Sequence, residues 1–530
     1  MNSIKASELK PLLTAGDEIA LLDVREQGQY GEGHPFFSVP FSYSRLEMLA
    51  ATLLPCKSTR IVVFDDADGV SAKAAAALAG LGYRNVAELE GGAPAWAAAG
   101  YTLYKGVNVI SKTYGELLEH VADTPRMTAA EVNTLRERDP SVVVLDGRSP
   151  AEYSKMSLPG ALCCPNAELG YRIQSLVPDE STTIVINCAG RTRSILGVEG
   201  LRVLNTKNPV IALENGTQGW CLAGLDLDHG VSPQTLPDPN DEQITALGAT
   251  ARALIAASGL ELVSLETTNQ WLRDDERTTY LLDVRTKAEF SAAHFPGAHH
   301  APGGQLVQAT DQYVAVRNAR IVLSDDNRLR AATTAIRLQD MGHDVYLLDA
   351  DASTASPNEQ ADDSDDSGDS SSGHADFPSV ELTQAMTILD ASPGMTYREG
   401  HIAGARWVTR ARLEAMELDT AAHLLITGQD EALIDGVAIE LRASGFDNLK
   451  TCAGSPETWA DAGHAVVVTP DVPTDEDCID YLFFVHDRHD GNMDAARRYL
   501  KWETGLIAQL DEQERSVLNP RAKFDLDGER

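Results

Sequence analysis

A short segment with Leu-Asp at its centre recurs along the chain and constrains the fold more than any other feature. Three copies are clear, at residues 21–25, 144–148 and 281–285, and a weaker copy lies at 388–392. Each copy begins with an apolar run of the kind that forms a buried strand. A segment repeated at such spacing indicates that the fold is built from several copies of one structural unit.

Further elements follow each copy in the same order. A turn comes first, at 33–35, 158–161, 294–298 and 401–405. A second apolar run, followed by a polar loop and a helical pattern, comes next, at 61–64, 184–187, 321–323 and 424–426. A turn followed by Trp closes the first, second and fourth copies. Strands that alternate with helices predict a largely parallel sheet. We therefore predict an α/β protein of four tandem domains, each a mainly parallel β-sheet flanked by helices, with a helical C-terminal tail.

The boundaries of these units follow from composition and periodicity. The four domains are predicted at 1–105, 124–232, 260–350 and 376–470, and the tail at 471–530. Helical patterns at 106–123 and 241–259 connect the domains, and the tail carries one helix at about 492–512. The stretch from Asp349 to Asp376 is rich in Ser, Asp and Gly, so a disordered acidic linker is expected at 351–375.

Composition limits the partners and the compartment. The 530 residues carry a net charge of −35, which argues against nucleic acid and anionic membrane surfaces as partners. No run of 18 apolar residues and no apolar N-terminal targeting segment occurs, so a cytoplasmic protein is expected. The seven Cys are scattered without a Cys-x-x-Cys pair, which fits a reducing compartment and indicates neither a metal site nor a cofactor.

The candidate site is the loop that follows the second apolar run of the second copy. Cys188 ends the predicted strand, and a helical pattern begins at Ser194. A Cys in such a turn lies near unpaired backbone N–H groups and the positive end of a helix dipole. Arg191 and Arg193 add positive charge. These effects favour the thiolate, which is the nucleophilic form.

Together the Leu-Asp-x-Arg strand, the His-x-Pro-Gly-Ala turn, the strand–Cys–loop–helix and the Gly-Gly-x-x-x-Trp turn resemble the rhodanese (sulfurtransferase) family. The resemblance is specific in the second domain, good in the first and third, and weak in the fourth. It implies that Cys188 carries a persulfide and that the loop wraps around the outer sulfur. The residues that would bind the substrate are Ala189, Gly190, Arg191, Thr192, Arg193 and Ser194. Asp146 and Arg148 are interpreted as a supporting pair that braces the loop.

The other three copies lack the Cys. Aligned backward from the following helix, the position of Cys188 is taken by Asp65, by Ser324 and by about Thr427. None of these side chains can carry a persulfide, so three copies are expected to be inactive scaffolds.

The leading hypothesis is a sulfurtransferase of the thiosulfate sulfurtransferase type. Its partners would be a small sulfur donor and a thiol or cyanide acceptor, without a metal or organic cofactor, and a homodimer is compatible with the sequence. Two alternatives remain open. One is a Cys-dependent phosphatase or arsenate reductase on the same fold, although Arg193 follows Cys188 one residue too early for such a loop. The other is a non-catalytic sulfur carrier or redox scaffold.

Overall fold

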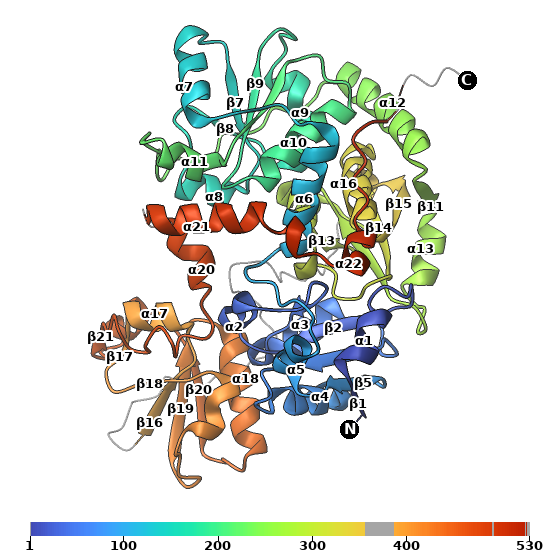
Figure 1. Ribbon diagram of the computed structural model, residues 1–530. Coiled ribbons are helices and arrows are strands. Elements are labelled where there is room, and N and C mark those ends of the chain that lie inside the picture. Colours follow the sequence, from blue (N-terminus) through green and yellow to red (C-terminus); the bar gives the residue numbers. More distant parts are fainter. Residues whose placement is uncertain (1, 356–385, 490–491, 525, 527–530) are drawn as a thin grey trace. The chain divides into compact units, whose positions relative to one another are not determined.

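The computed structural model describes residues 2–355, 386–489, 492–524 and 526, and it separates into two compact units (Figure 1). One unit consists of Met1–Leu9, Ala20–Gly106 and Gln360–Phe483. The other consists of Lys10–Ile19, Val107–Glu359 and Phe484–Arg530. The first domain therefore shares a unit with the fourth, and the second shares a unit with the third and with the C-terminal segment. No helix in the described ranges is long and apolar enough to cross a bilayer.

The first three domains have the same five-stranded sheet, in which every neighbouring pair of strands is parallel. In the first domain the strand order is β1-β5-β4-β2-β3. Its strands are β1 (Asn2–Ile4), β2 (Ala20–Asp23), β3 (Val39–Pro40), β4 (Ile61–Phe64) and β5 (Val86–Leu89). Its helices are α1 (Ala6–Leu12), α2 (Gln27–Glu32), α3 (Leu46–Leu53), α4 (Val70–Gly80) and α5 (Gly92–Ala98), with a 3₁₀ turn η1 (Tyr43–Arg45).

The second domain repeats this order as β6-β10-β9-β7-β8. Its strands are β6 (Arg126–Met127), β7 (Val143–Asp146), β8 (Leu162–Cys163), β9 (Ile184–Asn187) and β10 (Val210–Leu213). The connecting helix is α6 (Val109–Ala122), and the helices of the domain are α7 (Ala129–Arg138), α8 (Pro150–Lys155), α9 (Asn166–Leu176), α10 (Thr192–Val203) and α11 (Gly216–Leu222).

The third domain follows the connecting helix α12 (Asp241–Ser258) and has the order β11-β15-β14-β12-β13. Its strands are β11 (Glu261–Val263), β12 (Thr279–Asp283), β13 (His299–His300), β14 (Arg320–Asp325) and β15 (Asp344–Asp351). Its helices are α13 (Leu265–Trp271), α14 (Lys287–Ala292), α15 (Gly303–Gln308) and α16 (Leu329–Asp340), with the 3₁₀ turns η2 (Thr310–Gln312) and η3 (Ala352–Thr354).

The fourth domain keeps a reduced form of the fold. Four parallel strands have the order β18-β16-β19-β20, and a separate antiparallel pair joins β17 to β21. The strands are β16 (Met386–Asp390), β17 (His401–Ile402), β18 (Arg406–Trp407), β19 (His423–Gly428), β20 (Leu449–Ala453) and β21 (Val466–Val467). The helices are α17 (Gly394–Glu399), α18 (Glu431–Ala443) and α19 (Pro456–Asp461), with a 3₁₀ turn η4 (Arg410–Ala415).

The core of the second domain shows why its strands read as continuous apolar runs. Parallel sheets are covered by helices on both faces, so both alternating sets of side chains are buried. One cluster contains Val144 and Val185 and packs around Trp220 of α11. The opposite cluster contains Ile184 and Ile186 and packs against helices α9 and α10. All four residues of β9 are buried, which holds the chain rigidly up to the start of the loop.

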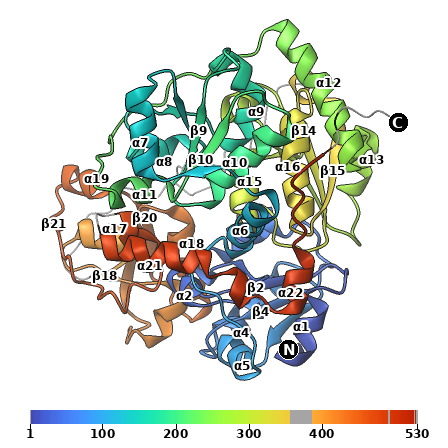
Figure 2. The same ribbon diagram turned by 45° about the horizontal axis from the view of Figure 1, so that its top comes forward.

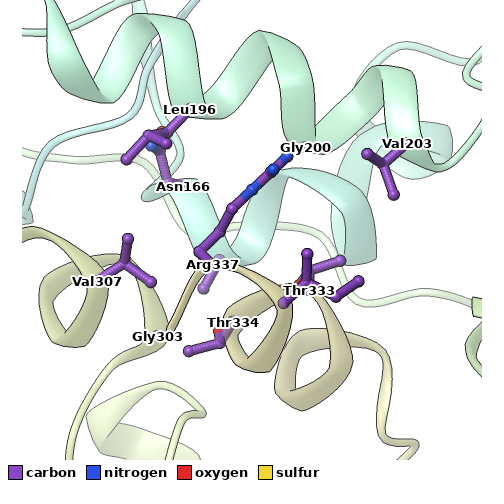
Figure 3. A pocket seen from close by; sticks show the side chains of 12 residues that line it. Asn166, Leu196, Gly200, Val203, Gly303, Val307, Thr333, Thr334 and Arg337 are labelled. Atoms are coloured by element: carbon purple, nitrogen blue, oxygen red, sulfur yellow. The ribbon is translucent and has the colours of Figure 1, made fainter. Parts of the chain in front are cut away.

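Within each unit, the two domains pack through equivalent helices. In the first unit, Tyr43 donates a hydrogen bond to Glu440 and Arg410 pairs with Glu47 at 2.6 Å. In the second unit, α9 and α10 lie beside α15 and α16 (Figure 2). A cavity of about 50 Å³ remains between these helices, and Figure 3 shows Arg337 of α16 extending toward Gly200 of α10 across it.

Two sequence-based boundaries need correction. The expected linker begins later than predicted, because β15 continues to Asp351 and the turn η3 buries Ala352. The remainder of that prediction, from residue 356 onward, lies outside the described residues. The single tail helix predicted at 492–512 is instead three pieces: α21 (Met493–Thr504), the turn η6 (Ile507–Gln509) and α22 (Glu512–Val517). The tail begins with α20 (Phe483–His486) and the turn η5 (Asp487–His489). Gly505, the residue with the weakest helix propensity in that stretch, caps α21.

Candidate active site

Cys188 lies immediately after β9, at the carboxyl edge of the sheet, where parallel α/β folds bind ligands. Helix α10 begins at Thr192, two residues earlier than the Ser194 start predicted from the sequence. The loop between the strand and the helix is therefore only four residues long. The side chain of Cys188 is almost fully buried, with 1% of its surface exposed. Cys188 is one of the residues that line the pocket described below.

Helix α11 holds the loop by its main chain. The N–H of Thr217 donates to the Cys188 carbonyl at 2.8 Å, and the N–H of Gln218 donates to the Ala189 carbonyl at 3.2 Å. Gly216 has φ +53°, and a Cβ built on it would lie 2.2 Å from the Cys188 carbonyl oxygen. Only glycine fits this position, because it tolerates the left-handed backbone and lets the two chains approach.

The sulfur of Cys188 lies 3.4 Å from the hydroxyl of Ser194. Burial raises the pKa of the Cys188 thiol, while the charge of Arg193 and hydrogen bonds from Ser194 act in the opposite direction. The carboxylate of Glu503 raises the pKa further. The sequence-based expectation that the loop favours the thiolate is therefore wrong, because desolvation outweighs the positive charge nearby.

Arg193 faces the sulfur but is held by an acidic partner. Its guanidinium makes two hydrogen bonds to Glu152 of α8, at 2.6 and 2.7 Å. Burial works against ionisation of Glu152, but Arg193 dominates and brings the pKa of this carboxyl to about 2. The Arg193 carbonyl accepts a hydrogen bond from Asn166 at 2.8 Å, which fixes the first turn of α10.

Arg191 is placed differently. Its guanidinium donates to Glu116 at 2.6 and 3.0 Å and also to Glu119, both on the connecting helix α6. Two carboxylates thus compensate its charge. The prediction that both arginines act on the sulfur therefore needs correction for the Arg191 side chain.

Asp146 and Arg148 form a buried pair at the end of β7. Arg148 donates to Asp146 at 2.9 and 2.7 Å and to the Met156 carbonyl at 2.6 Å. Asn187, the residue before Cys188, donates to the same carboxylate at 2.9 Å. The pair therefore fixes the strand end from which the loop departs. The first and third domains contain the same pair, as Asp23–Arg25 and Asp283–Arg285.

A pocket of about 190 Å³ opens over the loop. Its lining includes Cys188 to Arg193 and six polar side chains that sequence reasoning did not identify: Lys112, Gln305, Gln308, Arg488, Tyr499 and Glu503. They come from α6, α15 and the C-terminal segment, all within the second unit. No local motif could have indicated them, because they meet the loop only through tertiary packing. Within the described residues, no group of three or more His, Cys, Asp or Glu side chains is arranged to hold a metal ion.

Strand register corrects the alignment of the other copies. Asp146 lies opposite Asn187, the residue before Cys188. The equivalent Asp23 lies opposite Phe64, Asp283 opposite Ser324, and Asp390 opposite Thr427. The position of Cys188 is therefore taken by Asp65, as predicted, but by Asp325 and Gly428 in the third and fourth domains. The sequence alignment, which counted backward from the helix, placed these two copies one residue too early.

The carboxylates of Asp65 and Asp325 show what the loop does to an anion at this position. Asp65 accepts main-chain N–H bonds from Ala67, Gly69 and Ser71 at 2.9, 2.9 and 3.0 Å. Although burial opposes it, the N–H groups of Ser71 and Ala67 hold the pKa of Asp65 below its usual range.

Asp325 accepts N–H bonds from Asp326, Arg330 and Ala331 at 2.9, 2.9 and 3.2 Å, although burial, together with the neighbouring Asp326, raises its pKa to about 7. Counted from Cys188, the two sets of donors correspond to five residues of the second domain: Ala189, Gly190, Thr192, Arg193 and Ser194. The main-chain N–H groups of the loop thus converge on a carboxylate oxygen, which lies one bond beyond the Cγ atom of the Asp.

A model of the rhodanese-like domain matches residues 5–99, 128–223 and 264–352, which is more than half of the chain. The chain belongs to the rhodanese family. It is similar to the crystal structure of a thiosulfate sulfurtransferase from Pseudomonas aeruginosa, with 35% identity and a TM-score of 0.87 over 98% of this chain and 99% of that one.

Two shorter similarities involve a single domain. An HTH-type transcriptional regulator of Mycobacterium tuberculosis is 32% identical over 124 residues, which is 21% of this chain and 54% of the regulator, so the chain spans about half the length of that relative. A protein from Anabaena sp. is 31% identical over 20% of this rhodanese chain and 86% of its own, with a TM-score of 0.19.

Proposed function

We propose that this rhodanese-family protein is a sulfurtransferase that moves a sulfane sulfur from thiosulfate or a similar donor to a thiophilic acceptor through a persulfide on Cys188. The observation that carries the proposal is the anion position seen in the inactive copies. An Asp carboxylate oxygen is one bond beyond the γ atom, and so is the outer sulfur of a Cys persulfide. The loop residues that bind the Asp65 and Asp325 oxygens correspond to those around Cys188.

The donors of the second domain are free to bind such a sulfur. Within the described residues, the main-chain N–H groups of Ala189, Gly190 and Arg191 have no hydrogen-bond acceptor. Thr192, Arg193 and Ser194 begin α10, where the first N–H groups have no partner inside the helix. Convergent N–H groups of this kind stabilise charge that develops at a reacting centre.

The donor step follows from this geometry. The Cys188 thiolate attacks the outer sulfur of thiosulfate, and a new S–S bond forms. The bond between the two sulfur atoms of thiosulfate breaks, and sulfite leaves with the electron pair. Lys112 and Arg193 line the pocket and supply positive charge that attracts the anionic donor.

The test is the intact mass of the full chain after incubation with thiosulfate. The wild-type protein is expected to gain the mass of one sulfur atom, and Cys188→Ser is expected to gain none and to form no thiocyanate from cyanide. Cys221→Ser is the matched control, because Cys221 belongs to the same domain and is more exposed than Cys188. Loss of persulfide in the control alone, or its retention in Cys188→Ser, would contradict the proposal.

The same experiment separates the alternatives. A sulfur carrier without catalytic turnover would gain the sulfur but release little thiocyanate over many cycles. A phosphatase or arsenate reductase would act on a phosphate ester or arsenate instead. The position of Arg193, which follows Cys188 one residue too early for a phosphate-binding loop, does not favour that second class.

A further inference from the structure

Helix α21 of the C-terminal segment brings a carboxylate into the Cys188 pocket. Glu503 lies in its last turn, has 2% of its surface exposed, and lines the same 190 Å³ pocket as Cys188. One of its oxygens, Oε1, accepts a hydrogen bond from the Thr192 hydroxyl at 2.9 Å. The carboxylate is thus fixed directly against the catalytic loop by a helix that is not part of any sheet-bearing domain.

The other oxygen, Oε2, has no hydrogen-bond partner among the described residues. It points at the loop, because a Cβ built on Gly190 would lie only 3.0 Å from it. A buried carboxylate oxygen without a partner destabilises the folded protein, because it has lost its hydrogen bonds to water and makes none to the protein. Such an oxygen is suited to accept a hydrogen from a group that enters the pocket.

Glu503 does not help the donor step. Its charge opposes an anionic donor and raises the pKa of Cys188. Lys112 faces the same pocket, but its Nζ donates to the Val107 carbonyl at 2.7 Å and forms no ion pair with Glu503 within the described residues. A buried acidic group that disfavours the first half of the reaction is best explained by a role in the second half.

We propose that Glu503 accepts the S–H proton of the sulfur acceptor, so that the natural acceptor is a thiol that enters the pocket in its protonated form. This inference rests on the proposed sulfurtransferase function and specifies the acceptor class of the same site.

The acceptor step balances within the pocket. The acceptor S–H bond breaks and the proton passes to Glu503 Oε2. The acceptor sulfur attacks the outer sulfur of the Cys188 persulfide, which carries the negative charge left by the donor step and takes that charge with it to the acceptor. A new S–S bond forms, and the S–S bond to Cys188 breaks with its electron pair on Cys188. The proton then returns from Glu503 to the Cys188 sulfur. The products are an acceptor persulfide and the Cys188 thiol, the form that burial favours.

The test separates the two halves of the reaction in the full-length chain. Cys188 is loaded with thiosulfate, the donor is removed, and the loss of the persulfide is followed by mass after addition of one of two small thiols. Ethanethiol and trifluoroethanethiol are matched in size, and at a pH between their pKa values the first is a thiol and the second a thiolate.

Glu503→Gln is expected to slow transfer to ethanethiol by about a hundredfold, as for the loss of a general base, and transfer to trifluoroethanethiol by less than about threefold. Asp494→Asn, which removes an exposed charge from the same helix, should change neither rate. Equal slowing with both thiols, or no slowing with either, would overturn the inference. Glu503→Asp should show the same selectivity with a smaller factor, and it serves where the Gln variant does not load.

Failure of the wild-type chain to take up sulfur would instead refute the proposed function itself.

Discussion

The loops of the second and third domains have the same supporting residues but differ in what they bind. Arg193 pairs with Glu152 of α8, and the equivalent Arg330 pairs with Glu289 of α14. Arg330, however, also contacts Asp325, Asp326 and Glu168, and none of its side chain is exposed. Arg193 has one acidic partner and faces a pocket.

This difference shows how copies with different loop chemistry can share one fold. In the third domain the anion that the loop requires is covalently part of the chain, as Asp325, and four carboxylates surround the single guanidinium. In the second domain the γ position is a sulfur, and the anion must come from a substrate. The supporting strands and braces are unaffected, because the core and the loop are separate sets of residues.

The largest effect is expected when Asp325→Cys is combined with Cys188→Ser. The new Cys should gain no sulfur from thiosulfate, because Arg330 remains neutralised by three carboxylates. The third domain should also lose about 3 kcal/mol of stability or more, since a buried charge loses a partner. Thermal unfolding and intact mass measure the two effects. Asp349→Asn, which breaks an exposed pair with Arg328, is the control. Persulfide at residue 325 would show that the charge around the loop matters less than the comparison indicates.

A smaller effect should distinguish the two arginines of the active loop. Arg193→Ala is expected to raise the pKa of Cys188 and slow its alkylation near neutral pH by about tenfold, which corresponds to one pKa unit. Arg191→Ala should leave the alkylation profile nearly unchanged and lower the unfolding temperature, because Glu116 and Glu119 lose their buried partner. The rate of iodoacetamide labelling against pH tests both variants. Identical profiles for the two variants would contradict the assignment of Arg193 as the charge that acts on the sulfur.

The smallest effect concerns Lys112 and pH. Burial, the largest influence, lowers the pKa of Lys112 to about 7, with Glu503 acting in the opposite direction and Arg488 and Arg193 reinforcing burial. The ammonium is therefore present below pH 7 and lost as the pH rises through 7. Thiosulfate binding should weaken over that range, even though a higher pH increases the thiolate fraction of Cys188.

Lys112→Met should raise the KM for thiosulfate by about tenfold at pH 6, the value of one charged hydrogen bond, and should remove the dependence of KM on pH near 7. A KM that still rises through pH 7 in Lys112→Met would assign the titration to another group.

The sequence determined the repeated architecture and the residue that we propose to be reactive. Pairs such as Leu145–Asp146 and Leu282–Asp283 mark where a central strand of each sheet ends. They can be recognised because an apolar run buried on both faces is followed there by a polar residue. Cys188 was identifiable because it lies between such a strand and a helix start. The one-residue errors at Asp325 and Gly428 arose because the alignment relied on helix starts estimated from apolar patterns, whereas the hydrogen-bonded register of the strands fixes the position directly.

The tertiary structure alone decided which domains share a unit and which charges reach the sulfur. Local patterns report on neighbours in the chain, but Glu503 reaches Thr192 across 311 positions, and Arg191 finds Glu116 across 75. Burial also outweighs the positive charge of Arg193, so the pKa of Cys188 is raised instead of lowered. Desolvation depends on everything packed around an atom, so no local motif can give its value.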